Sequence, residues 1–254
     1  MKELEIAKRA VLEAGDFLLG NFGKKIVAEY RSGKGLISEF DIKAENLIVE
    51  LLKKEFPNYG VIGEETGVGK GDSEFTWIVD PLDGTTNFVV GVPIFAVAVA
   101  LARENQVLAS AIYIPTTKEL FSAEKSKGAF LNNERITVSD QTNLNKAVVV
   151  FGRGRSEEDI KRFLKNFVSI GELLGPPRIF GSTVYEFTTV ACGKADFLIN
   201  NGASIWDYAA GTLLVSEAGG KVSDFNGEDW DLTKKEVIAS NGKIHEKTLA
   251  VLNS

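Results

Sequence analysis

The stretch of residues 77–88 constrains the fold of this chain more than any other. It opens with apolar residues that predict a buried strand, and it then turns sharply, because Pro81 fixes its own φ and Gly84 lets the backbone approach a ligand closely. Asp80 and Asp83 flank the proline, so both carboxylates can face one hard cation. Sites in α/β proteins lie at such strand ends. The stretch therefore predicts an α/β fold with an acidic site where this strand ends.

The residues that follow, Thr85-Thr86-Asn87, can open a helix whose free N–H groups favour an anion. Carboxylates for a metal beside N–H groups for a phosphate indicate a metal-dependent phosphoryl site. A plain surface turn is the alternative, since Pro-x-Asp and Asp-Gly turns are common. An EF-hand calcium loop is excluded, because its ligand positions would fall on Leu82 and Gly84 and its closing Glu on Gly91.

Two further acidic elements extend the predicted site. A short strand at residues 59–62 delivers Gly63-Glu64-Glu65 at its end, and Asp207 lies at the start of a long apolar helix. Taken separately, a Glu pair is usually solvated and Asp207 could simply cap its helix. Together with Asp80 and Asp83, Glu64 and Asp207 supply four negative charges, which two divalent ions would balance. A phosphate could then enter an approximately neutral site.

Three segments resemble the signature motifs of the inositol monophosphatase family. They are Gly-Glu-Glu at residues 63–65, Asp-Pro-Leu-Asp-Gly-Thr-Thr-Asn-Phe at 80–88 and Trp-Asp-Tyr-Ala-Ala-Gly at 206–211. The family comprises magnesium-dependent, lithium-sensitive phosphatases of the fructose-1,6-bisphosphatase-like superfamily, and the resemblance covers nearly the whole chain. It implies an α/β fold (α+β by some schemes), built as a layered α/β/α/β sandwich of two intimate subdomains and commonly a homodimer. We expect the subdomains to span residues 1–142 and 143–254.

The resemblance also implies a role for individual positions in a site with two or more Mg²⁺ ions. The metal ligands would be Glu64, Asp80, the backbone carbonyl of Leu82, Asp83 and Asp207, with Asp80 bridging two ions. The catalytic residues would be Glu64, Asp41 and Thr85, of which Asp41 and the Thr85 hydroxyl would orient and deprotonate the attacking water. A helix N-cap is the alternative role for Asp41, and both roles are compatible.

The expected substrate is a small phosphorylated polyol or sugar, first of all inositol monophosphate. The residues that the resemblance places against it are Asp83, Gly84, Thr85, Gly181, Ser182, Thr183, Asn200 and Asp207. Asn200 stands where animal inositol monophosphatases have a Glu, so it adds no negative charge there. Fructose 1,6-bisphosphate, alone or as a second substrate, is therefore the nearest alternative. A 3′-phosphoadenosine nucleotide and a non-catalytic phosphate-binding role are more distant ones.

Covalent catalysis is not expected. Cys192, the only cysteine, follows an apolar helical segment and reads as a small buried hydrophobe, while His245, the only histidine, lies in a polar segment without a motif around it. Residues 151–155 lack the third glycine of a dinucleotide-binding loop and read as a connector. Arg153 and Arg155 in that segment could still meet a second phosphate.

Whole-chain properties exclude several other classes. The chain of 254 residues is 44% hydrophobic and 25% charged, as expected of a globular protein, and its net charge of −6 argues against nucleic-acid binding. No apolar run is long enough to span a membrane, and the acidic start of the chain does not resemble a signal peptide. A single cysteine suits the cytoplasm. Scarce Cys, Met, His and Gln beside abundant Lys and Glu hint at a thermophilic source.

Apolar periodicity and turn residues predict the order of the elements. Strands cluster first and then alternate with helices, which indicates two layered subdomains with the site at their seam. Hairpin turns are expected at Asn105-Gln106 and Asn132-Asn133. The expected helices are 4–22, 42–56, 157–168 (capped by Ser156), 182–192 and 206–218. The expected strands are 59–62, 77–79, 95–102, 107–114, 120–123, 147–151, 195–199 and 236–240.

Overall fold

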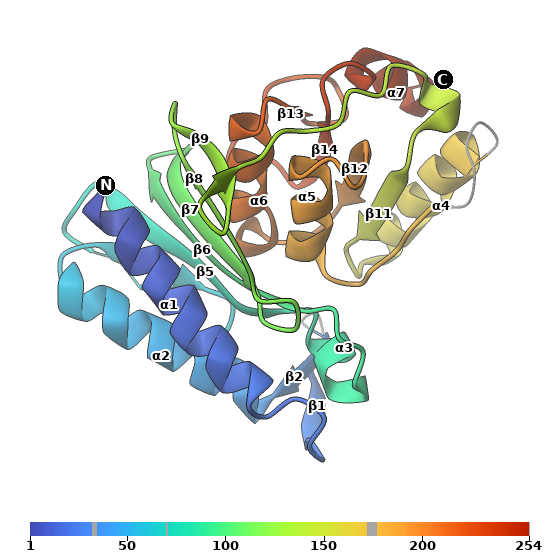
Figure 1. Cartoon of the computed structure of the whole chain (residues 1–254). Coiled ribbons are helices and arrows are strands. Elements are labelled where there is room, and N and C mark those ends of the chain that lie inside the picture. The colour runs from blue at the N-terminus through green and yellow to red at the C-terminus, as the bar shows by residue number, and fades with distance from the viewer. Residues whose placement is uncertain (32–34, 70, 172–176, 254) are drawn as a thin grey trace.

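A computed structural model describes residues 1–31, 35–69, 71–171 and 177–253 (Figure 1). Its largest element is an eight-stranded sheet in the order β10-β9-β8-β7-β6-β5-β3-β4, antiparallel except where β3 pairs with β5. Apolar residues dominate the central strands because both faces of the sheet are covered. The strands are β3 (Gly60–Gly63), β4 (Gly67–Gly69), β5 (Phe75–Asp83), β6 (Ala96–Arg103), β7 (Gln106–Ile114), β8 (Glu119–Glu124), β9 (Gly128–Leu131) and β10 (Glu134–Arg135).

A four-stranded sheet in the order β11-β12-β14-β13 follows in the second half of the chain, with β11 and β12 parallel. A separate hairpin of β1 and β2 precedes the first motif. The strands of the four-stranded sheet are β11 (Val149–Arg153), β12 (Phe197–Asn201), β13 (Lys221–Ser223) and β14 (Glu236–Ser240), and those of the hairpin are β1 (Ala28–Arg31) and β2 (Gly35–Ser38).

Helices cover the sheets in layers, as Figure 1 shows. The pair α1 and α2 covers one face of the eight-stranded sheet, α5 and α6 lie between the two sheets, and α4 and α7 cover the outer face of the four-stranded sheet. The short α3 follows β5. The helices are α1 (Lys2–Leu19), α2 (Glu39–Glu55), α3 (Thr85–Val90), a 3₁₀ turn (Leu144–Lys146), α4 (Glu157–Gly171), α5 (Thr183–Ala191), α6 (Ile205–Glu217) and α7 (His245–Leu252). No described helix is long and apolar enough to cross a membrane.

Three hydrophobic cores hold these layers together, a middle one around α5 and α6 and one beneath each outer pair of helices. The middle core joins apolar side chains of both sheets to those of α5 and α6. The cores on either side lie beneath α1 and α2 and beneath α4 and α7. Because the middle core is shared, we propose the division at residues 142 and 143 as one between subdomains of a single catalytic unit.

The layered α/β fold is confirmed, and α4 and α7 add a fifth layer to the expected sandwich. The turn at Asn132-Asn133 is also confirmed, with φ values of 48° and 71° at those residues. The other predicted turn is wrong by one residue, since β7 already begins at Gln106. The predicted connector at residues 151–155 is wrong for its first part, because β11 continues through Arg153.

Two helices have other boundaries than the sequence predicts, each for a physical reason. The first helix ends at Leu19 and not at residue 22, and Phe22 packs against Phe88 and Phe95 from the loop beyond it. The second begins at Glu39, because Ser38 caps it. The hairpin of β1 and β2 and the helix α7 were not predicted. Both are short, and α7 buries its apolar side only against neighbours that are distant in the sequence.

Candidate active site

A bulge at the end of β5 brings the two motif aspartates to one side of the strand. In a regular strand, residues three apart face opposite ways. Here Asp80 pairs with Ala98 but Asp83 pairs with Ala96, so β5 carries one residue more than its partner β6. The extra residue reverses the alternation, and both carboxylates therefore point away from the α1 and α2 layer, toward α5 and α6.

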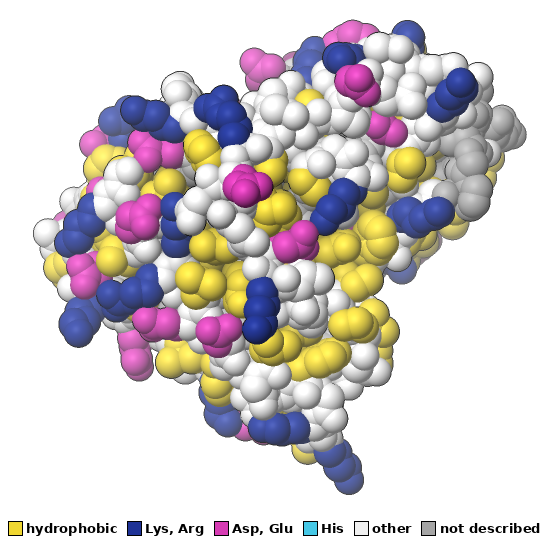
Figure 2. Space-filling model, in the orientation of Figure 1, with side chains coloured by type: hydrophobic (Ala, Val, Ile, Leu, Met, Phe, Trp, Pro, Cys, Tyr) yellow, Lys and Arg dark blue, Asp and Glu magenta, His cyan; other side chains and the backbone are white. Residues whose placement is uncertain are grey.

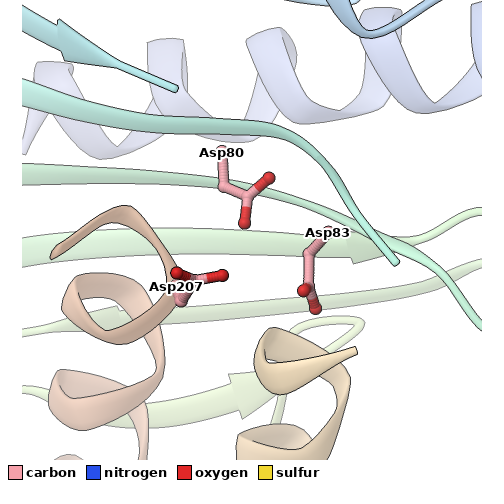
Figure 3. Close-up of side chains that lie close together, drawn as sticks. All are labelled: Asp80, Asp83 and Asp207. Carbon is pink, nitrogen blue, oxygen red and sulfur yellow. The ribbon is translucent and has the colours of Figure 1, made fainter. Parts of the chain in front are cut away.

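Asp207 completes an acidic cluster from the other side. Each of Asp80, Asp83 and Asp207 offers a carboxylate oxygen, and these oxygens all lie within 4.8 Å of one another. Figure 3 shows the three side chains converging on one space, two from β5 and one from the first turn of α6. Glu64, which follows β3, lies outside this group of three but close enough for its charge to act on Asp80.

Asp83 is held firmly by the start of α5. Its Oδ1 accepts the Thr183 N–H at 3.1 Å, and its Oδ2 accepts the Val184 N–H at 2.7 Å and the Ser182 hydroxyl. Burial raises its pKa, while the hydrogen bond from Ser182 opposes that change. The contacts therefore join β5 to α5 and fix the direction of the carboxylate.

Asp80, by contrast, has little to satisfy it. Its side chain is buried, its Oδ1 accepts only the Leu82 N–H at 3.2 Å, and its Oδ2 finds no hydrogen-bond donor among the described residues. Burial and the charge of Glu64 raise its pKa well above the ordinary value. A buried carboxylate oxygen without a donor is costly. The donor set, all oxygen and all acidic, fits a hard divalent cation that would supply the missing positive charge.

The pKa values of the other two acids, Glu64 and Asp207, are raised as well. Burial and then the charge of Asp207 raise the pKa of Glu64 to about 9. Burial and then the charge of Asp83 raise the pKa of Asp207 to about 7. Asp207 also accepts the Ser204 N–H at 2.6 Å, so it stabilises the first turn of α6 as well as entering the cluster. The crowding of four acids is electrostatically favourable only with a cation present.

Asp41 and Thr85 form a hydrogen-bonded pair beside the cluster. The Thr85 hydroxyl donates to Asp41 Oδ1 at 2.7 Å and lies 3.1 Å from the Leu82 carbonyl oxygen. Asp41 is not the N-cap of its helix: Ser38 is the cap, and Asp41 Oδ2 accepts from both the N–H and the hydroxyl of Ser38. Burial raises the pKa of Asp41 against these hydrogen bonds. Gly84, whose φ is 92°, lets the chain turn from β5 into α3.

The predicted substrate segment lies directly beside the acids. Ser182 is buried against Asp83, Thr183 is partly exposed and Gly181 is exposed in a left-handed conformation with φ of 72°. Asn200 is completely buried on β12, where its amide donates to the Thr183 hydroxyl oxygen at 3.1 Å. A direct contact between Asn200 and a substrate stays a prediction.

Two buried acids near the site were not identified from the sequence. Glu45 accepts the N–H groups of Glu65 and Thr66 at 2.9 and 2.6 Å, and so fixes the turn that carries Glu64. Its position four residues after Asp41, on the same helix face, is the signal that could have revealed it. Glu186, one turn into α5, accepts the Phe180 N–H at 3.0 Å, and burial raises its pKa well above the ordinary value.

Neither the only cysteine nor the only histidine of the sequence lies among the site residues. His245, although it stands in a polar segment of the sequence, is buried in α7 between the hydroxyls of Ser223 and Ser240, at 2.9 and 2.8 Å. Cys192 is only half-buried, at the end of α5, where burial raises the pKa of its thiol. The surroundings of both residues therefore indicate a structural role and not a catalytic one.

Comparisons with known proteins identify the family of the chain. The chain is 38% identical to an inositol-1-monophosphatase of Mesorhizobium japonicum, over 97% of this chain and 94% of that protein. It is 37% identical to a fructose-1,6-bisphosphatase/inositol-1-monophosphatase of Aquifex aeolicus, over 98% and 95%. The crystal structure of the extragenic suppressor protein suhB from Bartonella henselae superposes with a TM-score of 0.95 at 34% identity, covering 100% and 99% of the two chains. The inositol monophosphatase family model matches residues 2–254, and the chain belongs to that family.

Proposed function

We propose that this protein is a metal-dependent phosphomonoesterase that hydrolyses inositol monophosphate to inositol and phosphate. The observation that carries the proposal is the cluster of Asp80, Asp83 and Asp207, each of which offers a carboxylate oxygen within 4.8 Å of the others. In addition, the buried Oδ2 of Asp80 finds no hydrogen-bond donor in the part of the chain that the structure describes. A non-catalytic protein that only binds phosphate would have no need of such an acid cluster, because the acids repel a phosphate unless cations are bound. Family membership supports the same activity.

Magnesium is the cation that we propose, with two or more ions in each site. Glu64, Asp80, Asp83 and Asp207, together with the Leu82 carbonyl, would hold it, because Mg²⁺ prefers oxygen ligands and carboxylates above all. Bound divalent ions would lower the pKa of a water molecule and neutralise charge on the phosphate. No protein nucleophile is then required.

The residues around the cluster have complementary tasks in this proposal. Thr85 Oγ1 accepts a hydrogen bond from the attacking water while its own proton lies toward Asp41 Oδ1, at 2.7 Å. Burial raises the pKa of Asp41, which makes it a better proton acceptor than an exposed aspartate. The backbone N–H groups of Gly84 and Thr85 would bind the phosphate, as the family resemblance implies.

Fructose 1,6-bisphosphate is the second candidate substrate, and one observation favours it. The guanidinium of Arg155 lies so close against Gly35 of β2 that a Cβ atom at Gly35 would overlap it. Its charge partly opposes the rise in the pKa of Asp207 that burial and Asp83 cause. A cation in this position, close enough for its charge to act on Asp207, could receive a second phosphate. The Aquifex aeolicus relative carries both activities in its name.

We further propose a homodimer. Figure 2 shows apolar side chains exposed on the face that carries α3. Val90 is the last residue of α3 and Val92 follows it closely, and their side chains are 65% and 38% exposed. Asn87 links this region to Phe180 through a hydrogen bond of 2.7 Å, and Ile179 beside it is 57% exposed. A patch of this kind is typical of a protein interface.

The single cysteine and the amino-acid composition support a cytoplasmic, thermophilic protein, and the net charge of −6 supports a protein without a nucleic-acid or membrane partner.

Phosphate release tests the proposal. The purified protein is assayed with inositol 1-phosphate, fructose 1,6-bisphosphate and 3′-phosphoadenosine 5′-phosphate, each with Mg²⁺ and with EDTA. We expect the highest turnover with inositol 1-phosphate and none in EDTA. Equal or faster release from the bisphosphate would establish dual activity, whereas absence of release from all three compounds would refute the proposed function.

A further inference from the structure

Behind the proposed substrate site, three side chains form a continuous hydrogen-bonded chain, here called the polar chain: Tyr208, Asn200 and Thr183. The Tyr208 hydroxyl lies 3.0 Å from Asn200 Oδ1, and Asn200 Nδ2 lies 3.1 Å from Thr183 Oγ1. The three residues come from α6, β12 and α5. The inference drawn from them rests on the proposed function, since it concerns the leaving group of the same substrate.

The direction of the polar chain is set at its buried end. The Tyr208 oxygen accepts the Ala203 N–H at 3.2 Å, so its own proton goes to the nearer of two acceptors, Asn200 Oδ1 at 3.0 Å over the Lys235 carbonyl at 3.3 Å. With its oxygen facing Tyr208, the amide of Asn200 presents its nitrogen to Thr183. The Thr183 oxygen is thereby an acceptor in this contact, and its hydroxyl proton is free to bind elsewhere.

Only the far end of the polar chain reaches the site. Asn200 and Tyr208 are both 0% exposed, whereas Thr183 is partly exposed and donates its backbone N–H to Asp83. Gly152 of β11 makes room for the arrangement, because a Cβ atom there would overlap Asn200 Nδ2. Asn200 is thus fixed from three sides and cannot turn toward a ligand without breaking the polar chain.

We propose that the Thr183 hydroxyl is a fixed hydrogen-bond donor to an oxygen of the leaving group, and that Asn200 and Tyr208 are positioning residues that hold it in this role. The site would then select leaving groups that present an acceptor oxygen at this point. An anionic phosphate oxygen accepts more strongly than a hydroxyl. The effect of Thr183 is therefore larger for fructose 1,6-bisphosphate than for inositol 1-phosphate.

Four variants test the role of the hydroxyl. Thr183→Val removes the hydroxyl but keeps the shape of the side chain. We expect KM to rise about three- to tenfold with little change in kcat, because this factor corresponds to the free energy of one hydrogen bond. Thr183→Ser restores the hydroxyl. Asn200→Asp turns the Thr183 proton inward, because a carboxylate accepts from both neighbours, and should therefore reproduce the Thr183→Val effect. Thr189→Val is the matched control: its hydroxyl, on the same helix, bonds to the Glu186 carbonyl.

The double variant Thr183→Val/Asn200→Asp gives the sharpest outcome. If both changes remove one donor, the second adds no further rise in KM to the first. Fully additive effects, or an unchanged KM in Thr183→Val, would overturn the proposal. Tyr208→Phe, which frees the amide to turn over, should raise KM in the same direction and serves if Asn200→Asp does not fold.

Binding measured without turnover separates this inference from the proposed function. Calorimetric titration with fructose 6-phosphate should show the same three- to tenfold weakening in Thr183→Val, rescued in Thr183→Ser. If the wild-type protein releases phosphate and Thr183→Val binds and turns over normally, the inference alone fails. If the wild-type protein releases no phosphate from any substrate, the proposed function fails, and equal binding of the product by wild type and Thr183→Val would then refute the inference as well.

Discussion

Replacing Asp80 by Asn should stabilise the metal-free protein while removing its activity. The new amide can keep the hydrogen bond from the Leu82 N–H through its carbonyl oxygen, and the change removes a charge for which no described residue supplies a donor at Oδ2. Two unit charges 4.8 Å apart repel by about 3 kcal/mol at an effective dielectric constant of about 20. At a pH where Asp80 and either Asp83 or Asp207 are both ionised in the folded protein, the variant should therefore gain about 3 kcal/mol in free energy of unfolding.

The gain should grow with pH. The pKa of Asp207 is raised to about 7 and that of Glu64 to about 9, so the folded protein retains protons that the unfolded chain has already lost. Stability therefore falls as the pH rises from about 4 toward 9, because each deprotonation adds a charge to the cluster. Asp80→Asn removes one of the interacting charges and should flatten this slope.

Urea unfolding in EDTA, from pH 5 to pH 9, measures both effects. A matched control is Asp196→Asn, which changes a buried aspartate satisfied by the Val148 N–H at 2.6 Å and by Ser139, and which should destabilise. Added Mg²⁺ should stabilise wild type, by about 2.7 kcal/mol at one hundred times its Kd, but not Asp80→Asn. The reasoning is refuted if Asp80→Asn is less stable than wild type in EDTA, or if Mg²⁺ stabilises both alike.

Three other changes probe separate parts of the structure. Thr85→Val should lower kcat at least about a hundredfold without unfolding the protein, and Thr85→Ser should restore it, as steady-state assays would show. Glu45→Gln offers one acceptor oxygen to two N–H donors and should weaken Mg²⁺ binding about tenfold in calorimetric titration, against an unchanged affinity if the turn after β3 is rigid by itself. Burial lowers the pKa of His245 to about 4, so the unfolded chain binds a proton first. Stability present above pH 6.5 should fall by about 2–3 kcal/mol on acidification to pH 4, and His245→Gln should lose this share of the pH dependence in urea unfolding.

The residues of the candidate site could be predicted from the sequence more completely than the fold that surrounds them. Local signals sufficed for the apolar strands and for the motif at residues 80–88, because a proline, a glycine and two acids occur together in one turn. They did not reveal how the two acids come to share a side. That depends on the bulge, which exists only because β5 pairs with β6 out of register between Asp80 and Asp83.

The features that could not be predicted from the sequence depend on contacts between segments that are distant in the chain. His245 stands among polar neighbours in the chain, yet strands β13 and β14 supply the two serine hydroxyls that bury it. Glu45 looks like one more surface acid of an amphipathic helix until β3 places the Glu65 N–H against it. The hydrogen bonds of Asn200 were equally invisible, since both of its partners lie on other elements.

The two motif aspartates and the proposed substrate residues belong to different layers of the fold. Asp80 and Asp83 lie on the eight-stranded sheet, whereas Asn200 and the residues around Thr183 belong to β12 and to α5 above it. In the proposed function, substitutions on β12 and α5 can therefore change which alcohol is released without replacing any of the proposed cation ligands. A lineage built on this plan can acquire new substrates one side chain at a time, and a laboratory selection for altered preference should find its first gains on β12 and α5.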